Sequence, residues 1–226
     1  MIKTRIAILV SGRGSNMQRL VEACEQQLPS VEIVLVASNK PCAGIDFAVA
    51  RGLPTALIDR ETYDSRHAQE TALAINIEAA AADWIFLAGY MVVLSADFVA
   101  RFTGRILNIH PSLLPALKGL DTHQRALDAR MSQHGASVHI VTAALDDGPV
   151  ILQAGLKINE DETAETLAER VLQLEHCLLP FVLASLATGK LSLNNAVPHW
   201  EERTKIFATV DAVTRDFLED HAIWPR

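Results

Sequence analysis

Short runs of β-branched and other apolar residues alternate along this chain with longer stretches of helical period. The runs predicted as strands are Ile6–Val10, Glu32–Ala37, Thr55–Ile58, Trp84–Leu87 and Arg105–Ile109. The stretches predicted as intervening helices are Asn16–Gln26, Ile45–Arg51, Ser65–Ala81 and Ala96–Arg101. This alternation is typical of repeated βα units over a parallel sheet. We therefore predict an α/β fold with a doubly wound, mostly parallel sheet and a Rossmann-like, nucleotide-binding N-terminal half.

The pattern changes after residue 109. Residues 110–121 are rich in proline and glycine and are predicted as a loop before a short helix at Thr122–Ala129. Two more strands, Ala136–Val141 and Pro149–Leu156, precede a long helix over Thr163–Ala187. No linker or repeat divides the chain, so we expect one domain over 1–226, made of a nucleotide-binding half (1–109), a second half (110–190) and a C-terminal tail (191–226).

Composition excludes several classes of function. The 226 residues are 50% hydrophobic and 21% charged, and the formal net charge is −7, which argues against a nucleic-acid partner. The apolar runs are shorter than the roughly 18 residues of a membrane span, and Ile6–Val10 is too short for a signal peptide. Cys24, Cys42 and Cys177 form no close pair, as expected in a reducing compartment. We expect a cytoplasmic protein with no membrane partner.

A glycine-rich turn, Ser11-Gly12-Arg13-Gly14-Ser15-Asn16, lies between the first predicted strand and the first predicted helix. Glycines permit close approach of a ligand, and the free N–H groups at a helix N-terminus favour an anion. Met17 replaces the third glycine of a dinucleotide fingerprint, and no Walker A lysine follows. Two interpretations remain from the residue types alone: a cradle for one phosphate group, or an ordinary βα turn with a Ser or Asn cap.

Asn108 and His110 lie at the predicted carboxyl end of the fifth strand, the edge at which open α/β sheets bind ligands. Residues two apart on a strand point the same way, so both side chains should face one site. An amide N–H and an imidazolium can stabilise an oxyanion, and histidine transfers protons near neutral pH. Asp146 is the candidate carboxylate to orient this histidine. The alternative is a structural His110, which is the role we expect for His67, His176, His199 and His221.

Other catalytic arrangements are missing from the sequence. There is no Cys-x-x-Cys or His-Glu-x-x-His pattern and no Gly-x-Ser-x-Gly elbow. We therefore expect neither a metal site nor a covalent intermediate. His139, in a predicted strand near Asp146, is expected to support the site indirectly.

These motifs together resemble the glycinamide ribonucleotide formyltransferases of purine biosynthesis. The matching segments are Ser11–Asn16, Leu87–Met91, Leu107–Pro115, Gly119–His123, Gly135–His139 and Leu145–Ile151. The resemblance implies an α/β fold of formyltransferase type, with residues 110–190 as the folate-binding and catalytic half. It also implies the reaction, which is transfer of a formyl group from the co-substrate N10-formyltetrahydrofolate to the amine of glycinamide ribonucleotide, without a metal. A monomer or a homodimer is compatible with it.

The resemblance implies a role for each matched position. Asn108, His110 and Asp146 correspond to the family's catalytic residues. The residues implied to bind the ribonucleotide are Gly14, Ser15 and Asn16 at its phosphate and Glu175 at its ribose. The residues implied to line the folate pocket are Arg66, Met91, Val92, Val93, Leu94, Asn108, Thr142, Ala143, Ala144, Leu145 and Asp146. In the implied mechanism Asn108 and protonated His110 stabilise the oxyanion, while Asp146 helps to relay a proton towards N10.

Three positions depart from the family pattern. Val92 stands where some members carry an arginine that faces the folate, so the affinity for the folate tail is expected to differ. Leu172 replaces a polar residue that assists the counterpart of Glu175 in some members, and Asp121 replaces a histidine. None of these positions belongs to the catalytic trio, so we expect them to change binding rather than reaction type.

Three other functions are weighed against this one. A formyltetrahydrofolate hydrolase is expected to add an N-terminal regulatory domain, and a methionyl-tRNA formyltransferase to add a basic C-terminal domain. A non-catalytic nucleotide-binding module would need the glycine-rich turn but would not need Asn108, His110 and Asp146 together, and this chain has all three. Formyl transfer to the ribonucleotide therefore remains the preferred hypothesis.

Overall fold

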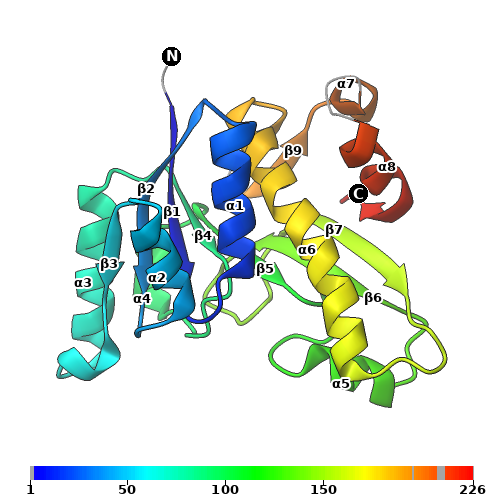
Figure 1. Cartoon of the computed structure of the whole chain (residues 1–226), viewed down its shortest axis with the longest axis horizontal. Helices are drawn as coiled ribbons and strands as arrows, with labels where there is room; N and C mark the ends of the chain where they lie inside the picture. The colour runs from blue at the N-terminus through cyan, green and yellow to red at the C-terminus, as the bar shows by residue number, and fades with distance from the viewer. Residues whose placement is uncertain (1–2, 195, 208–211, 226) are drawn as a thin grey trace. The chain divides into compact units, whose positions relative to one another are not determined.

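The computed structural model of the protein describes residues 3–194, 196–207 and 212–225. The chain forms two compact units, Met1–Leu107 and Asn108–Arg226. Each unit is built around its own strands, and Figure 1 labels the elements of both. This division into two units neither supports nor contradicts the single domain predicted from the sequence, which stays a prediction.

The first unit is a parallel sheet with helices. Its elements in chain order are β1 (Thr4–Val10), α1 (Ser15–Gln26), β2 (Val31–Ser38), α2 (Ala43–Ala50), β3 (Thr55–Leu57), the 3₁₀ helix η1 (Arg60–Thr62), α3 (Arg66–Ala79), β4 (Trp84–Leu87) and α4 (Ala96–Arg101). The strand order is β4-β1-β2-β3, and the pairs β1/β2, β1/β4 and β2/β3 are all parallel. This arrangement confirms the predicted α/β class.

Strand β1 is the centre of this unit because it is flanked by a strand on each side. Residues Ile6–Val10 are fully buried, as expected for a central parallel strand covered on both faces. The chain moves from β1 to β2 and β3 on one side and then returns to β4 on the other. Right-handed crossovers consequently place α1 and α2 on one face of the sheet, in front of it in Figure 1, and α3 on the opposite face.

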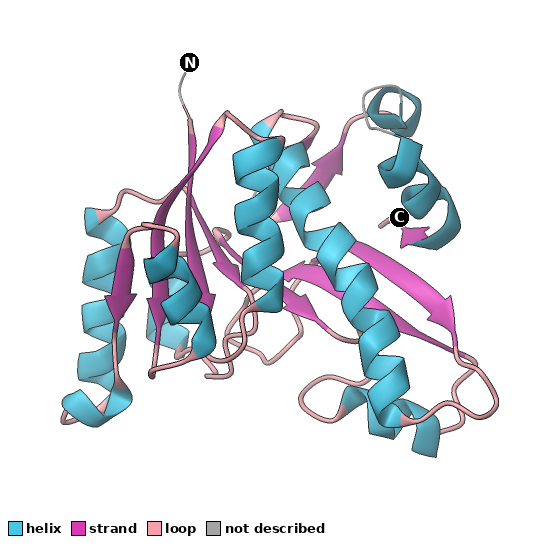
Figure 2. Ribbon diagram, viewed as in Figure 1, coloured by secondary structure: helices cyan, strands magenta, loops and turns pink. Residues whose placement is uncertain are grey.

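The second unit is dominated by antiparallel pairing. Its elements are β5 (Ile106–His110), which crosses the boundary between the units, α5 (Thr122–Asp128), β6 (Gln133–Ile140), β7 (Val150–Lys157), α6 (Ala164–Ala187), β8 (Leu191–Asn194), β9 (Val197–Trp200), α7 (Arg203–Phe207), α8 (Ala212–His221) and β10 (Ala222–Ile223). The order is β5-β6-β7-β10, with β6/β7 and β7/β10 antiparallel, while β8 and β9 form a separate hairpin. Figure 2 distinguishes these strands from the helices.

Helix α6 packs against β6 and β7. It begins with a capping box, in which the Thr163 side chain accepts from the backbone N–H of Thr166 and the Thr166 side chain accepts from the N–H of Thr163. By length and composition alone it is apolar enough to cross a membrane, but half of its most apolar window is buried inside the structure. Leu167, Val171 and Leu178 are fully buried, which is the burial expected of a core helix.

The predicted elements match the observed ones closely, with end points that differ by no more than three residues. The differences have local causes. For example, β6 begins at Gln133 because it pairs with β7 from Gln133↔Lys157 onward. The predicted loop at 110–121 begins at Pro111, since His110 is still the last residue of β5. The tail, for which the sequence predicts no elements, contains β8, β9, α7, α8 and β10.

Gly135 tests the close pairing of β6 with β7. A Cβ atom at this position would lie 2.0 Å from the carbonyl oxygen of Ala154 on β7, so the two strands would have to separate. We expect Gly135→Ala to lower the thermal midpoint by several degrees, as a loss of a few kcal/mol does in a chain of this size. Gly12→Ala is the control, because its Cβ would meet no atom within 4 Å. Equal midpoints in a melting experiment would contradict this description of the strand pair.

Candidate active site

In the first unit, Ser11 connects the loops that leave β1, β2 and β4. Its backbone N–H donates to the carbonyl of Gly89 at 3.1 Å, and its hydroxyl accepts from the backbone N–H of Met91 at 2.9 Å. The same hydroxyl donates to Oδ1 of Asn39, directly after β2. These contacts lie at the carboxyl ends of parallel strands, where the strand order reverses around β1, the position at which α/β sheets bind ligands.

The glycine-rich turn has the geometry of a tight approach between two helices. Gly14, which precedes α1, has a φ of 74°, and an added Cβ would lie 3.0 Å from the Cα of Gly44 at the start of α2. The backbone N–H of Gly44 in turn donates to the carbonyl of Gly12 at 2.9 Å. Only glycine accommodates both the backbone conformation and the contact.

The start of α1 has the features of an anion site. Ser15 is its first residue, Asn16 is buried, and no acidic residue occupies its first turn. The turn is open beside Gly12, where an added Cβ would meet nothing within 4 Å. A helix N-terminus that carries no acidic residue in its first turn can bind a phosphate.

A second feature of the first unit is the segment at residues 91–94, which follows β4. Met91 and Val93 are 73% and 55% exposed, whereas Leu94 is buried. Arg66 holds this segment, because its Nη2 donates to the carbonyl of Val93. Exposed apolar side chains on a fixed backbone can pack against a flat ring system.

Glu70 organises the same region from α3. Its carboxylate accepts from Arg66 Nε at 3.0 Å, from the backbone N–H of Ser95 at 3.0 Å and from the Ser95 hydroxyl. The side chain of Glu70 is 9% exposed, so it is a buried charge with a charged partner and two further donors. The arginine is consequently fixed by one charge-assisted bond and leaves part of its guanidinium exposed.

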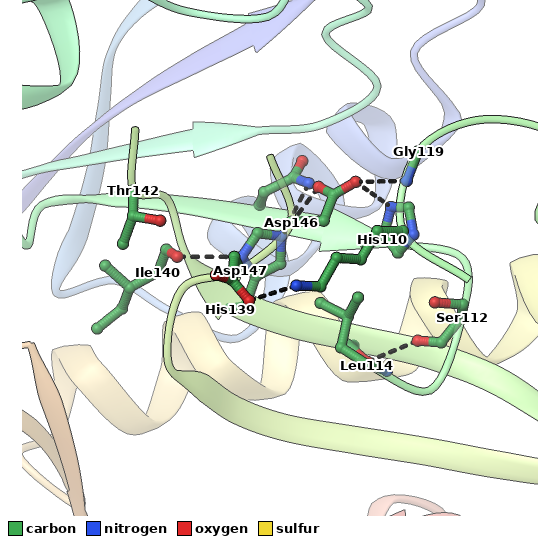
Figure 3. A network of polar contacts seen from close by, with 12 residues as sticks. His110, Ser112, Leu114, Gly119, His139, Ile140, Thr142, Asp146 and Asp147 are labelled. Carbon is green, nitrogen blue, oxygen red and sulfur yellow. Dashed lines mark hydrogen bonds and ion pairs between the residues drawn. The ribbon is translucent and has the colours of Figure 1, made fainter. Parts of the chain in front are cut away.

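In the second unit, the imidazole of His110 is held at both ring nitrogens. Nε2 donates to the carbonyl of Leu117 at 3.0 Å, and Nδ1 lies 3.5 Å from Oδ2 of Asp146. The side chain of His110 is 7% exposed and that of Asp146 is 9% exposed. Figure 3 shows the Asp146 carboxylate beside His110 and the backbone N–H of Gly119, which donates to Oδ2 at 2.9 Å.

His139 on β6 connects Asn108 to the same carboxylate. Its Nδ1 donates to the carbonyl of Ile140 at 3.0 Å, so Nε2 is free to accept from Nδ2 of Asn108 at 3.1 Å. Nε2 also lies 3.6 Å from Oδ1 of Asp146. The second N–H of the Asn108 amide is left to donate to a ligand, because the first is used by His139.

Asp146 reaches this position through a strained turn between β6 and β7. Its φ is 47°, in the left-handed region that aspartate tolerates better than most residues. Gly148 makes the turn possible, since a Cβ there would lie 1.8 Å from the carbonyl oxygen of Ile140. The close approach of the two strand ends therefore directs the carboxylate of Asp146 towards His110.

Burial favours the neutral form of three neighbouring histidines. It lowers the pKa of His139, against the opposing effects of the Ile140 carbonyl and the Asp146 charge. Burial also lowers the pKa of His123, and lowers that of His134 to about 4 with a contribution from His123. Nδ1 of His123 and Nε2 of His134 are hydrogen-bonded at 3.2 Å, as one neutral donor and one neutral acceptor.

This arrangement provides two donors for an oxygen that gains negative charge, Asn108 and His110, together with a carboxylate that can accept a proton. The other residues predicted from the sequence lie outside this hydrogen-bond network. Thr142, Ala143, Ala144 and Leu145 lead into the Asp146 turn, and Leu145 is largely exposed. Glu175 is buried on α6, and Val92 is partly exposed. Among the described residues, no group of three or more His, Cys, Asp or Glu side chains is placed to hold a metal ion.

Sequence reasoning missed several residues that organise these sites. Ser11 and Asn39 each follow a strand directly, a position that could have marked them. The link from Asn108 to His139 could not be predicted, because it depends on the pairing between strands. Glu70 lies in the middle of a predicted helix, where a carboxylate normally indicates a solvent-exposed face.

Residues 4–183 match the formyl transferase family, and this range includes both the glycine-rich turn and the network of Asn108, His110 and Asp146. The chain belongs to the formyl transferase family.

Individual formyl transferases support this membership. The phosphoribosylglycinamide formyltransferase of Escherichia coli is 40% identical over 190 residues, which are 84% of this chain and 90% of that protein. A trifunctional purine biosynthetic protein of Bos taurus is 41% identical over 192 residues, but the match spans only 19% of its length. Among solved structures, the phosphoribosylglycinamide formyltransferase of Coxiella burnetii is 42% identical, with a TM-score of 0.81 over 87% of this chain and 95% of that one.

The neutral histidines predict a pH dependence of stability. A histidine whose pKa is lowered by folding binds fewer protons in the folded state, so its contribution to stability is full above about pH 6.5 and is lost as the pH falls towards 4. We expect the free energy of unfolding in urea to be smaller at pH 5 than at pH 7, and His134→Gln to reduce this difference. His67→Gln, at an exposed position on α3, controls for loss of a histidine. An unchanged difference in His134→Gln would refute the explanation.

Proposed function

We propose that this chain transfers the formyl group of N10-formyltetrahydrofolate to the amine of glycinamide ribonucleotide, as a phosphoribosylglycinamide formyltransferase of de novo purine biosynthesis. The observation that carries the proposal is the buried network of Asn108, His110, His139 and Asp146 at the end of β5. It occurs in a chain that is 40% identical to an enzyme of that name over nine-tenths of the enzyme's length.

The proposed chemistry is direct transfer without a covalent enzyme intermediate. The substrate amine attacks the formyl carbon and forms a tetrahedral intermediate whose oxygen carries the negative charge. The free amide N–H of Asn108 and the Nδ1–H of protonated His110, on the ring nitrogen that is not bonded to the Leu117 carbonyl, stabilise this oxygen. Asp146, through water, takes the proton released by the attacking nitrogen and passes it to N10. The bond from the formyl carbon to N10 then breaks, which leaves tetrahydrofolate and the formylated ribonucleotide.

The binding roles in this proposal are those that the resemblance to the family implies for the matched residues. Gly14, Ser15 and Asn16 bind the ribonucleotide phosphate at the N-terminus of α1, and Glu175 binds the ribose. Met91 and Val93, with Val92 and Leu94, contact the folate ring system. Thr142, Ala143, Ala144 and Leu145 do the same from the turn before Asp146. Arg66, which is fixed by Glu70, binds a folate carboxylate.

The proposal requires formyltetrahydrofolate as a co-substrate and no metal, and it assigns the enzyme to the cytoplasm. Both substrates are small molecules, so neither nucleic acid nor a membrane is a partner. Because Val92 carries no charge, Arg66 is the cation proposed to bind the folate tail. A monomer or a homodimer would be compatible with this function.

The direct test follows folate product formation from N10-formyltetrahydrofolate with and without glycinamide ribonucleotide. Turnover that requires the ribonucleotide and yields its formylated form is expected. Release of folate without an acceptor would indicate a hydrolase instead. No reaction in either sample, with nucleotide binding retained, would indicate a binding module.

Removal of the Asn108 donor tests the oxyanion role. We expect Asn108→Ala and the isosteric Asn108→Asp to lower kcat by about 10²–10³-fold, the usual effect of losing an oxyanion-hole donor. His110→Ala should have at least as large an effect. Asn76→Ala is the matched control, since the Asn76 amide donates to the Ala72 carbonyl of its own helix, remote in sequence from Asn108. A kcat within a few-fold of wild type in Asn108→Asp would refute the assignment.

Gly14 tests the phosphate cradle. A side chain there would be strained at a φ of 74° and would contact Gly44 and Met17. We expect Gly14→Ala to raise KM for the ribonucleotide about tenfold or more, the effect of losing hydrogen bonds to a charged group, with KM for the folate unchanged. Gly52→Ala is the control, because Gly52 also has a positive φ of 67° but no neighbour within 4 Å of its Cβ. An equal rise in both KM values would argue against a specific phosphate site.

A further inference from the structure

The loop from Pro111 to Leu120, which follows His110, is held mainly by side chains, with the backbone bonds from Ser112 to His110 and from Ala116 to Leu113 in addition. Its carbonyl oxygens accept hydrogen bonds from side chains of β5, α5, β6, β7 and the loop itself. The carbonyls that do so are those of Pro111, Ser112, Leu114, Ala116, Leu117, Lys118 and Leu120. A loop without regular structure thereby has a single defined conformation in this unit.

Ser137 on β6 is the central acceptor and donor beneath this loop. Its hydroxyl donates to the carbonyl of Ser112 at 2.6 Å and accepts from the backbone N–H of Leu114 at 3.1 Å. The remaining lone pair accepts from Nε2 of Gln153 at 2.8 Å. Ser137 and Ser112 are fully buried, so every one of these groups would be costly to leave unpaired.

Gln153 on β7 provides both hydrogens of its amide to this arrangement. Nε2 donates to the carbonyl of Leu114 at 2.9 Å as well as to Ser137. Its backbone is paired on the outer side by Ile223 of β10, and His221 donates from Nδ1 to the neighbouring carbonyl of Gly155 at 3.0 Å. The described tail residues that make these contacts lie beyond residue 183, where the family match ends.

Gln153 is connected to His110 by hydrogen bonds and by the short stretches of backbone between them. Ser137 fixes the carbonyl of Ser112, and the hydroxyl of Ser112 donates to the carbonyl of Ala116 at 2.7 Å. The next carbonyl, that of Leu117, accepts from Nε2 of His110. The ring of His110 therefore has its orientation set on one side by Asp146 and on the other by a loop that Gln153 holds in place.

We infer that Gln153 is a positioning residue for His110. It does not contact the reacting atoms; it fixes the loop whose Leu117 carbonyl holds the imidazole, and so directs Nδ1 towards Asp146 and the bound substrates. The catalytic part of this inference rests on the proposed function, whereas the positioning of the imidazole does not.

The test compares Gln153→Leu with the wild-type full-length protein by two independent measurements. Leucine has nearly the same size but no donor, so the Leu114 carbonyl and the Ser137 hydroxyl each lose a partner. We expect kcat for formyl transfer to fall about 10- to 100-fold, the effect of displacing a catalytic group by a fraction of an ångström to 1 Å. The KM values of both substrates should change by less than about threefold, because the substrate-binding groups are unaltered.

The second measurement is the imidazole N–H signal of His110 in the proton NMR spectrum. In the wild type the Nε2 hydrogen is bonded to Leu117 and should exchange slowly with solvent. We expect this protection to be lost in Gln153→Leu and kept in Gln133→Leu, the same change at an exposed position of β6. Since this signal needs no substrate, it separates failure of the positioning role from failure of the proposed function.

Ser137→Ala is a second variant of the same connection, and it keeps the inference testable if Gln153→Leu does not fold. The effects of Ser137→Ala and Gln153→Leu on kcat should be non-additive in the double variant, because both remove the same connection. Wild-type kcat together with a protected His110 signal in Gln153→Leu would overturn the inference. Full additivity of the two substitutions would overturn it as well.

Discussion

The contact between His110 and Asp146 constrains most of the second unit. Both side chains are almost completely buried, and a buried charge or imidazole is stable only when its polar atoms have partners. The Leu117 carbonyl supplies a partner for His110, and the Gly119 N–H supplies one for Asp146. The loop after β5 and the turn after β6 must therefore both adopt conformations compatible with this one pair.

The neutral form of His139 determines the orientation of Asn108, just as the contact between His110 and Asp146 determines that of the imidazole. His139 accepts from Asn108 only while its Nε2 is unprotonated, and burial favours that form because it lowers the pKa of the ring. The amide of Asn108 thereby has a fixed orientation, with one N–H used and one available. A charged imidazole at the same position would reverse the orientation of that amide and remove the donor that we propose for the oxyanion.

Both units use glycine where backbone segments come unusually close. Gly14 and Gly44 let the starts of α1 and α2 approach each other, and Gly148 lets the Asp146 turn lie against Ile140. Each contact lies beside a residue with a proposed role. In both units the backbone therefore sets the position of the functional groups, and side-chain packing then holds it.

The sequence by itself determined the succession of strands and helices, because apolar periodicity and turn residues act over a few neighbouring positions. It also determined that Asn108 and His110 share one side of a strand, since that follows from the two-residue repeat of an extended chain. The tertiary structure alone decided that His139 bonds to Asn108, that Glu70 holds Arg66 and Ser95, and that Gln153 supports the loop after His110. These contacts join elements far apart in the chain through strand register and helix packing. A local pattern carries no information about which polar groups such pairing brings within hydrogen-bonding distance.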